Sequence, residues 1–401
     1  MDPMSRRRIL AAAATGVITA AGGAAADDVP QPQEGARGGT EPGPRNLPVE
    51  RQNPDLLTPP ATDSGSLPNL KWPFALSHMR LQPGGWSRQT TVRELPVSTT
   101  IAGVNMRLNP GGVRELHWHK AAEWGIILDG RARLTCIDPQ GRSFIGDVGV
   151  GDLWYFPGGY PHSIQGLDQG CEFLLVFDDG SFSEENTFSL TDWLAHTPRD
   201  VLAKNFGVAA DAFAAIPSHE LYIYAGAVPP PLAAGQAAPS AAPAENFTFR
   251  LMEAPPIAAS AGSVRIADST TFRIARTIAA ALVEVEPGGL REMHWHPQAD
   301  EWQYYIEGQG RMTVFGSTAN ARTFDYQAGD VGYVPLGMGH YVENTGSTRL
   351  RFLEMFRSPV YLDVSLDQWL ALLPPALVKA HLNLSDATLA ALRTQRDPVV
   401  R

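Results

Sequence analysis

The sequence predicts an all-β protein made of two tandem β-barrels, each followed by a helical appendage. Three observations lead to this prediction. The apolar runs are short, rich in β-branched and aromatic residues and separated by turn residues, as at 126–128, 134–137 and 173–177. The chain also contains 38 glycines and 33 prolines, which disfavour long helices and favour turns. Finally, one pattern of motifs occurs twice, which indicates two copies of one unit.

The repeat is clearest around two histidine-rich segments. The hexapeptide RELHWH at 114–119 recurs as REMHWH at 291–296, and each copy follows a Pro-Gly-Gly triplet. A Gly-Asp pair, a proline and a histidine then follow in both copies at an offset of 178 residues, against 177 for the hexapeptide. Chance does not produce so many matches at nearly one offset, so we infer a tandem duplication. Helical spacing of Leu, Trp and Ala predicts the appendages at 189–215 and 365–395.

The repeat defines the expected domains. We place an N-terminal barrel domain at 71–227 and a C-terminal one at 245–401, with a Pro/Ala-rich join at 228–244. Residues 27–70 have little to bury and predict a flexible linker. Residues 1–26 carry consecutive arginines, an Ala/Gly-rich apolar stretch and an alanine triplet, which predicts an export signal of the twin-arginine type. We therefore expect an exported protein, periplasmic or secreted; an uncleaved Ala-rich leader is the alternative.

Charge and cysteine content narrow the function. The chain has 32 basic and 42 acidic residues, a net charge of −10, and its only basic run lies in the first ten residues. This argues against a nucleic-acid partner and against a polybasic membrane protein. No run of 18 apolar residues lies beyond the N-terminus, so we expect no membrane-spanning helix. Cys136 and Cys171 are expected to be buried thiols, with a single disulfide as the alternative.

Each copy contains three histidines and one glutamate at matching positions. In a strand, residues i and i+2 point to the same side, so His117 and His119 face one side together. Glu123 can return to the same cavity after a turn, and His162 follows the Gly-Asp turn. The second copy repeats this set as His294, His296, Glu301 and His340. Such donors suit Mn, Fe, Co, Ni or Zn and leave two positions of an octahedral ion open. The alternative, ordinary core or surface histidines, is disfavoured because the set is duplicated in register.

These motifs resemble the cupin signature, G-x(4)-H-x-H-x(3,4)-E followed by G-D-x(4)-P-x(4)-H, which the chain carries twice. Longer segments are similar to the oxalate decarboxylases, a family of manganese bicupins. These are GDLWYFP at 151–157, PHSIQ at 161–165, FDDGSFSE at 177–184 and GDVGYVP at 329–335. The similarity covers roughly residues 70–400. It implies two cupin barrels of the double-stranded β-helix (jelly-roll) type, two manganese ions per chain, and dioxygen as a second cofactor.

The resemblance also implies roles in a carboxy-lyase reaction that converts oxalate to formate and carbon dioxide. Glu184 would be the acid/base of a lid loop and Arg114 would bind the substrate carboxylate. Simpler alternatives are a solvated loop glutamate and a barrel-rim salt bridge. Trp154 would form an apolar cavity wall, or would only pack in the core. Arg291 and Glu354 are the substrate and acid/base candidates of the second site. The resemblance favours the first site as the catalytic one, and trimers stacked into a hexamer.

The sequence of the lid loop is compatible with functions other than decarboxylation. The family pattern is Ser-Glu-Asn-Ser-Thr, whereas this chain has SEENT at 183–187, which keeps the acid and adds a second carboxylate. Lid sequence in this family bears on whether formate or hydrogen peroxide is formed, so an oxalate oxidase is the nearest alternative. A non-catalytic bicupin is disfavoured because both ligand sets are complete. Arg114 together with Glu184 argues against a cupin isomerase or dioxygenase. Tyr222 is expected to contact the lid or the domain join, or simply to pack.

Overall fold

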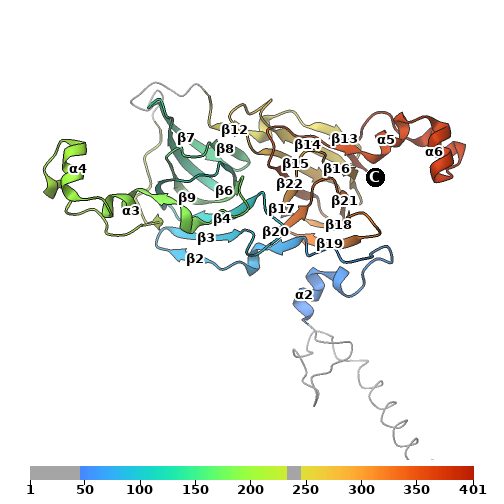
Figure 1. Ribbon diagram of the computed structural model, residues 1–401, viewed down its shortest axis with the longest axis horizontal. Coiled ribbons are helices and arrows are strands. Elements are labelled where there is room, and N and C mark those ends of the chain that lie inside the picture. The colour runs from blue at the N-terminus through green and yellow to red at the C-terminus, as the bar shows by residue number, and fades with distance from the viewer. Residues whose placement is uncertain (1–45, 233–244) are drawn as a thin grey trace, which may run out of the picture. The chain divides into compact units, whose positions relative to one another are not determined.

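The computed structural model describes residues 46–232 and 245–401 (Figure 1). The predicted export signal, the first part of the predicted linker and most of the predicted join lie outside these residues. The chain divides into two units, Met1–Pro60 and Ala61–Arg401. In the first unit, the described residues form the helix α2 (Leu47–Gln52) and the 3-10 turn η2 (Pro54–Leu56).

The second unit contains both repeats, drawn from blue to green and from yellow to red in Figure 1. The strands of the first repeat are β1 (Lys71–Pro73), β2 (Arg80–Gln82), β3 (Gly85–Thr90), β4 (Ala102–Leu108), β5 (Val113–Trp118), β6 (Glu123–Ile137), β7 (Ser143–Gly149), β8 (Asp152–Phe156), β9 (His162–Phe177), β10 (Phe188–Ser189) and β11 (Ile223–Tyr224). Its helices and 3-10 turns are η3 (Phe74–Leu76), η4 (Glu184–Asn186), α3 (Leu190–Ala195), α4 (Arg199–Phe206) and η5 (Ala210–Phe213).

The second repeat has a similar order of elements, in which the long strands β6 and β9 of the first repeat are each replaced by two shorter strands. Its strands are β12 (Thr248–Arg250), β13 (Ile257–Ala259), β14 (Gly262–Ala267), β15 (Ala279–Val285), β16 (Leu290–Trp295), β17 (Glu301–Glu307), β18 (Gln309–Phe315), β19 (Ala321–Gln327), β20 (Asp330–Val334), β21 (Gly339–Asn344), β22 (Leu350–Phe356), β23 (Val364–Ser365) and β24 (Val399–Val400). Its helical elements are η6 (Leu251–Glu253), α5 (Leu366–Leu372), α6 (Pro375–Leu382) and α7 (Asp386–Ala391).

The strands pair antiparallel to build two barrels. The first is an 11-stranded sheet with the order β12-β8-β6-β9-β4-β3-β2, in which β5 also pairs with β9, β10 and β11, and β7 with β6. The second consists of a sheet β1-β20-β17-β22-β15-β14-β13 and a sheet β19-β18-β21-β16-β23, with β24 on β16. The all-β prediction, with two barrels and a helical appendage after each, is confirmed.

The burial pattern of β6 reflects its place in a closed barrel. The first residues of β6 are buried on both faces, and β6 then alternates between buried and exposed side chains. Gly130 adopts φ +70° where the pairing of β6 with β9 shifts in register, a conformation that glycine adopts without strain.

Cys136 and Cys171 are free and buried, as predicted. Burial raises the pKa of Cys171 to about 12, which keeps that thiol protonated.

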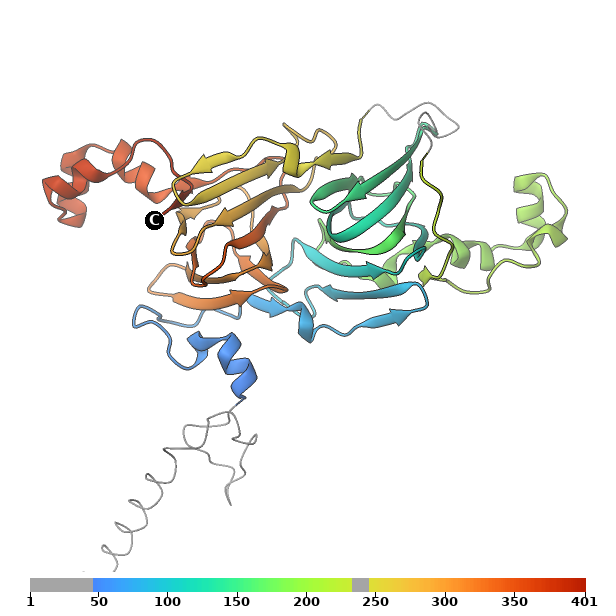
Figure 2. The same ribbon diagram turned by 180° about the vertical axis from the view of Figure 1, so that it is seen from behind.

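The first strand of each repeat pairs with the barrel of the other repeat. The predicted domain limits instead place each of these strands with its own repeat. Strand β1, predicted in the N-terminal domain, pairs with β20 of the second barrel, and β12 pairs with β8 of the first. In Figure 2, the blue strand of residues 71–73 lies beside the orange strands of the second barrel. Lys71 reinforces this pairing through a buried ion pair with Asp330, with Nζ and Oδ2 2.9 Å apart. Each repeat therefore completes the sheet of the other.

Part of the predicted linker is folded. Ser64 forms a β-bridge with Ala321, and the Asp63 carboxylate accepts a hydrogen bond of 2.7 Å from the Thr323 hydroxyl. Leu70 is fully buried in the core of the second barrel. The flexible-linker prediction is therefore wrong for residues 63–70, because a few side chains with specific partners order a stretch of otherwise polar composition.

The predicted helical appendages follow β10 and β23, and a short strand, β11 or β24, then returns to pair with β5 or β16. They leave large apolar side chains exposed, among them Trp193, Phe206, Trp369 and Leu372. Within the described residues, the structure contains no helix that is both long and apolar enough to span a membrane.

Candidate metal centres

The first barrel brings His117, His119, Glu123 and His162 together. His117 lies directly opposite His162 in the pairing of β5 with β9, and Glu123 begins β6. One nitrogen or oxygen atom from each of the four lies within 4.8 Å of the others, and all four side chains are buried. The spacing of the motif and the closure of the barrel thus produce the arrangement that the sequence predicts.

Backbone carbonyls set the orientation of the three imidazoles. Nδ1 of His117 lies 2.6 Å from the carbonyl oxygen of Glu115, and Nδ1 of His119 and His162 lies 2.7 Å from other carbonyl oxygens. A carbonyl oxygen only accepts, so each Nδ1 carries the proton and each Nε2 presents its lone pair. Burial and the neighbouring Arg114 hold the pKa of His117 well below its usual value. The lone pair of His117 is therefore available to an ion.

Glu123 supplies the negative charge of the first cluster. Its Oε2 lies 3.2 Å from Nε2 of His119 and 3.4 Å from Nε2 of His162. Burial alone would raise the pKa of Glu123, but His162 and His119 outweigh burial and hold this pKa below its usual range. The cluster is thus a buried carboxylate facing nitrogen lone pairs, which suits a divalent cation.

The second barrel repeats the arrangement. One ligand atom from each of His294, His296, Glu301 and His340 lies within 4.8 Å of the others, and all are buried. Within the described residues, Nε2 of His294 has no hydrogen-bond partner, and Nε2 of His296 and of His340 face only Oε2 of Glu301, at 3.1 and 2.8 Å. Buried polar atoms are rarely left without partners, so this set of lone pairs fits a bound metal ion.

The two centres differ in the group that orients the glutamate. Trp154, predicted as a cavity wall, is fully buried and donates a hydrogen bond of 2.8 Å from Nε1 to Oε1 of Glu123. In the second centre, Nε2 of Gln303 donates a hydrogen bond of 2.7 Å to Oε1 of Glu301. Sequence reasoning missed Gln303, because the donor moves from one strand to the next between the copies.

Glycines make this exchange of donors possible. Gly125 occupies in β6 the position that Gln303 occupies in β17, and a Cβ there would lie 2.2 Å from the Trp154 indole. Gly332 occupies in β20 the position of Trp154 in β8, and a Cβ there would lie 2.5 Å from the Gln303 amide. Each centre therefore pairs one donor side chain with a glycine that makes room for it.

Arg114 and Glu184 meet beside the first cluster. Both are buried, and Nη2 of Arg114 lies 3.0 Å from Oε2 of Glu184. Nη1 of Arg114 donates to the carbonyl oxygen of Tyr222 at 3.4 Å. Glu184 begins the short turn η4, which Ser183 caps by accepting from the backbone N–H of Glu185. The structure thus joins two predicted site residues that lie on different elements.

Arg291 is enclosed by acids beside the second cluster. Its Nε donates to Oε1 of Glu354 at 3.0 Å, and its Nη2 lies 2.6 Å from Oδ2 of Asp363 and 2.8 Å from the hydroxyl of Tyr361. Arg396 binds the same Asp363 carboxylate. Sequence reasoning found Glu354 but missed Asp363, Tyr361 and Arg396, because no motif or spacing marks them.

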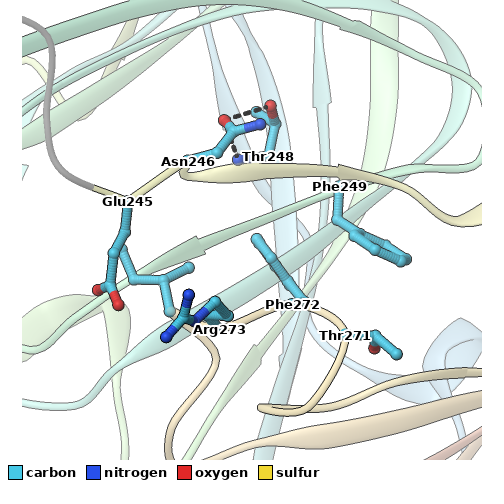
Figure 3. A pocket seen from close by; sticks show the side chains of 8 residues that line it. Glu245, Asn246, Thr248, Phe249, Thr271, Phe272 and Arg273 are labelled. Carbon is cyan, nitrogen blue, oxygen red and sulfur yellow. Dashed lines mark hydrogen bonds between the residues drawn. The ribbon is translucent and has the colours of Figure 1, made fainter.

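Three cavities help to separate the site from ordinary surface hollows. One of about 700 Å³ is lined by Glu184, Tyr222 and several basic side chains, and one of about 610 Å³ lies where the lid adjoins His119. A third, of about 460 Å³, lies at the start of the second repeat and is lined by Phe249 and Phe272 among others (Figure 3). The third cavity is lined neither by a cluster residue nor by Glu184, so we assign the site to the first two, which are lined by Glu184 and by His119 respectively.

Comparisons with known proteins agree with this geometry. The cupin family model matches residues 78–212 and 249–389. Oxalate decarboxylase OxdC of Bacillus subtilis is 56% identical over 376 residues, which are 94% of this chain and 98% of that protein. A probable oxalate decarboxylase of Arthroderma benhamiae is 40% identical over 92% of each chain. The solved structure of the B. subtilis enzyme at pH 4.6 has a TM-score of 0.87 and covers 93% of this chain and 98% of that one.

The fold and its two clusters define a bicupin with two potential metal centres, and the chain belongs to the cupin family. Within that family it belongs to the oxalate decarboxylases, and it is an enzyme of the carboxy-lyase class.

Proposed function

We propose that this protein converts oxalate to formate and carbon dioxide at the metal centre of the first repeat. The observation that carries the proposal is the buried pair of Arg114 and Glu184 beside a complete cluster of three histidines and one glutamate. Arg114 lies on the same strand as His117, so β5 positions both the cation and a metal ligand. The names of the similar proteins support oxalate as the substrate.

We propose manganese as the ion of both centres, two per chain, with dioxygen as the second cofactor. The donor set supports manganese, because imidazole and carboxylate ligands suit this ion, and a structure of the similar B. subtilis enzyme was studied for its Mn(II) centers. When bound, manganese and dioxygen would supply the redox chemistry that weakens the carbon–carbon bond of oxalate. The residues that would hold the ions are His117, His119, Glu123 and His162 in the first centre and His294, His296, Glu301 and His340 in the second.

The side chains of the protein bind the substrate and move a proton. The buried guanidinium of Arg114 orients a substrate carboxylate through charge-assisted hydrogen bonds. Glu184 carries the proton that reaches carbon to give formate. Hydrogen oxalate then yields one formate and one carbon dioxide, so the overall reaction needs no external reductant. Because Glu184 contacts Arg114, the proton donor and the substrate-binding cation act at one place.

We assign catalysis to the first centre because fewer acids neutralise the charge of Arg114 than that of Arg291. Arg291 is bound by Glu354 and Asp363, and the Glu354 carboxylate raises the pKa of Arg291 although burial alone would lower it. Arg291 and Glu354 remain the substrate and acid/base candidates of the second centre, but each already binds the other. We therefore assign the second centre a structural or auxiliary role.

Oxalate oxidation to carbon dioxide and hydrogen peroxide is the second candidate. The observation that favours it is the additional lid carboxylate of Glu185, which is exposed and lies 4.0 Å from the Arg93 guanidinium. A different charge on the lid changes the conditions under which Glu184 delivers its proton. A peroxide assay separates this activity from formate production.

We also propose export and assembly. The signal at 1–26 would direct the folded protein across the membrane, and the exposed Trp193 and Trp369 of the appendages would be covered in a trimer or hexamer. Cell fractionation with and without residues 1–26 tests export, and light scattering of the purified protein tests assembly. Recovery of the protein in the cytoplasm alone, or a monomer, would contradict the respective proposal.

Turnover of oxalate by manganese-loaded protein tests the function. Formate as the main product supports it, and absence of turnover in protein with two bound ions per chain contradicts it. Glu184→Gln keeps the side-chain shape but removes the transferable proton, so formate release should fall about 100-fold or more. Glu185→Gln is the matched control, because it changes the exposed neighbouring carboxylate and should retain formate production.

A further inference from the structure

The two copies hold their arginines by different means. Arg291 donates to Glu354, Asp363, Tyr361 and the carbonyl oxygen of Pro398. In the part of the chain that the structure describes, Glu184 is the one acid paired with Arg114, and Nε of Arg114 is buried without a hydrogen-bond partner. A buried guanidinium with an unused donor is the form in which an arginine binds an added carboxylate.

Strand registers show which residues replace the acids of the second centre. In β22, Glu354 lies opposite Ala281 and Gln303, and the matching position of β9, opposite Val104 and Gly125, is Leu175. Asp363 precedes the strand that pairs with Trp295, and Thr187 precedes the strand that pairs with Trp118. The first copy thus has neutral residues, Leu175 and Thr187, where the second has two carboxylates.

Tyr222 occupies the place of Pro398. Ile223 lies opposite Arg114 as Val399 lies opposite Arg291, so the preceding residues correspond. The carbonyl oxygen of Tyr222 accepts from Nη1 of Arg114 at 3.4 Å, as that of Pro398 accepts from Arg291 at 3.3 Å. The backbone contact is therefore common to both copies, whereas the side chain differs.

The ring of Tyr222 lies between two guanidinium groups. The guanidinium carbon of Arg114 is 4.4 Å from the ring centroid and that of Arg80 is 3.6 Å. The Tyr222 hydroxyl lies 2.6 Å from the hydroxyl of Ser87, and the ring is fully buried. The backbone of Tyr222 adopts φ +56°, a left-handed conformation that is costly for a bulky residue. Such strain persists only where the surrounding contacts hold the residue in place.

We infer that Tyr222 is the positioning residue that holds Arg114 ready for a substrate carboxylate. Its ring face and carbonyl fix the guanidinium without cancelling its charge, whereas the acids around Arg291 fix and neutralise it. This inference rests on the proposed function, since the ligand of Arg114 is taken to be oxalate. It explains why the duplicated motif gives one centre suited to a substrate carboxylate and one with its arginine already occupied.

Oxalate binding tests the inference separately from turnover. Binding is measured by calorimetry on manganese-loaded protein without dioxygen, with metal content and melting temperature recorded for each variant. Tyr222→Leu removes the ring and should weaken binding by about 3- to 30-fold, from the range of cation–π energies. It should also raise KM for oxalate by more than it lowers kcat. Tyr222→Phe keeps the ring and should bind within about twofold of the unmodified protein. Tyr224→Leu, two residues further along the chain, is the matched control and should bind normally.

The outcomes separate this inference from the proposed function. If the unmodified protein neither binds nor converts oxalate, the proposed function fails. If it does both and folded Tyr222→Leu binds equally well, the positioning role fails while the function stands. Should Tyr222→Leu not fold, Thr187→Asp gives Arg114 the acid that Arg291 has. Because the added carboxylate would pair with Arg114, this variant should weaken oxalate binding by about tenfold or more. Normal binding would overturn the inference.

Discussion

The hydrogen bond from Trp154 to Glu123 allows a quantitative test of the first centre. Trp154→Phe keeps an aromatic ring but removes the N–H that donates at 2.8 Å to a buried carboxylate. A hydrogen bond to a charged group contributes about 1.5–3 kcal/mol. Since about 1.4 kcal/mol corresponds to a tenfold change, manganese binding at the first centre should weaken by about 10- to 150-fold.

The matched variant is Gln303→Met, which removes the corresponding donor at 2.7 Å from Glu301 in the second centre. Competition with a chelator, monitored by the electron paramagnetic resonance of bound manganese, measures the manganese affinity of each centre. Trp154→Phe should weaken only the first centre and lower oxalate turnover at limiting manganese. Gln303→Met should weaken only the second centre and leave the turnover of the first nearly unchanged.

The smaller ring of Trp154→Phe also leaves space above Gly125, where the indole now lies. The resulting loss of stability, about 1–3 kcal/mol, is followed by denaturant unfolding at saturating manganese. A folded Trp154→Phe protein that binds manganese with unchanged affinity at both centres would refute the assignment of Trp154 as the group that orients Glu123.

Three further predictions concern the second barrel and the metal. Leu70→Ala should lower the free energy of unfolding by about 2–5 kcal/mol, because Leu70 is fully buried in that barrel; urea unfolding with an unchanged midpoint would contradict this. Burial would raise the pKa of Glu284, but hydrogen bonds from Ser263 and Arg265 hold this pKa below its usual value of 4.5. The ionised Glu284 carboxylate therefore stabilises the fold above pH 4.5, and this stabilisation is lost as the pH falls through the lowered pKa. Glu284→Gln should therefore lower the melting temperature at pH 7 but much less at pH 3, and an equal difference at both would exclude the mechanism. Removing metal with a chelator should lower the melting temperature because lone pairs and a carboxylate are left buried without an ion, and manganese should restore it; an unchanged melting curve would contradict a structural contribution from the metal.

The ligand sets were predictable because each depends on local geometry. Two histidines at positions i and i+2 of a strand face one cavity, and the register of β5 with β9 places His162 opposite His117. The same local reasoning predicted the helical appendages. The duplicated motif made the second set as clear as the first.

The exchanged strands and the partners of the glutamates and arginines were not predictable in this way. Nothing in the local sequence around Lys71 indicates that β1 joins the other barrel. There, Lys71 forms a buried ion pair with Asp330. Trp154 and Gln303 perform one task from two different strands, so comparing the copies position by position conceals their equivalence.

The resemblance to the oxalate decarboxylases singled out Arg114 and Glu184, and the sequence by itself determined the duplication, the all-β class and the two sets of predicted metal ligands. These properties follow from residue spacing along single strands and from motifs that recur. Only the tertiary structure decided which barrel each first strand joins, which donor orients each glutamate and how far each arginine is neutralised. Those outcomes depend on contacts between residues far apart in the chain, whose distances are set by strand register and side-chain packing.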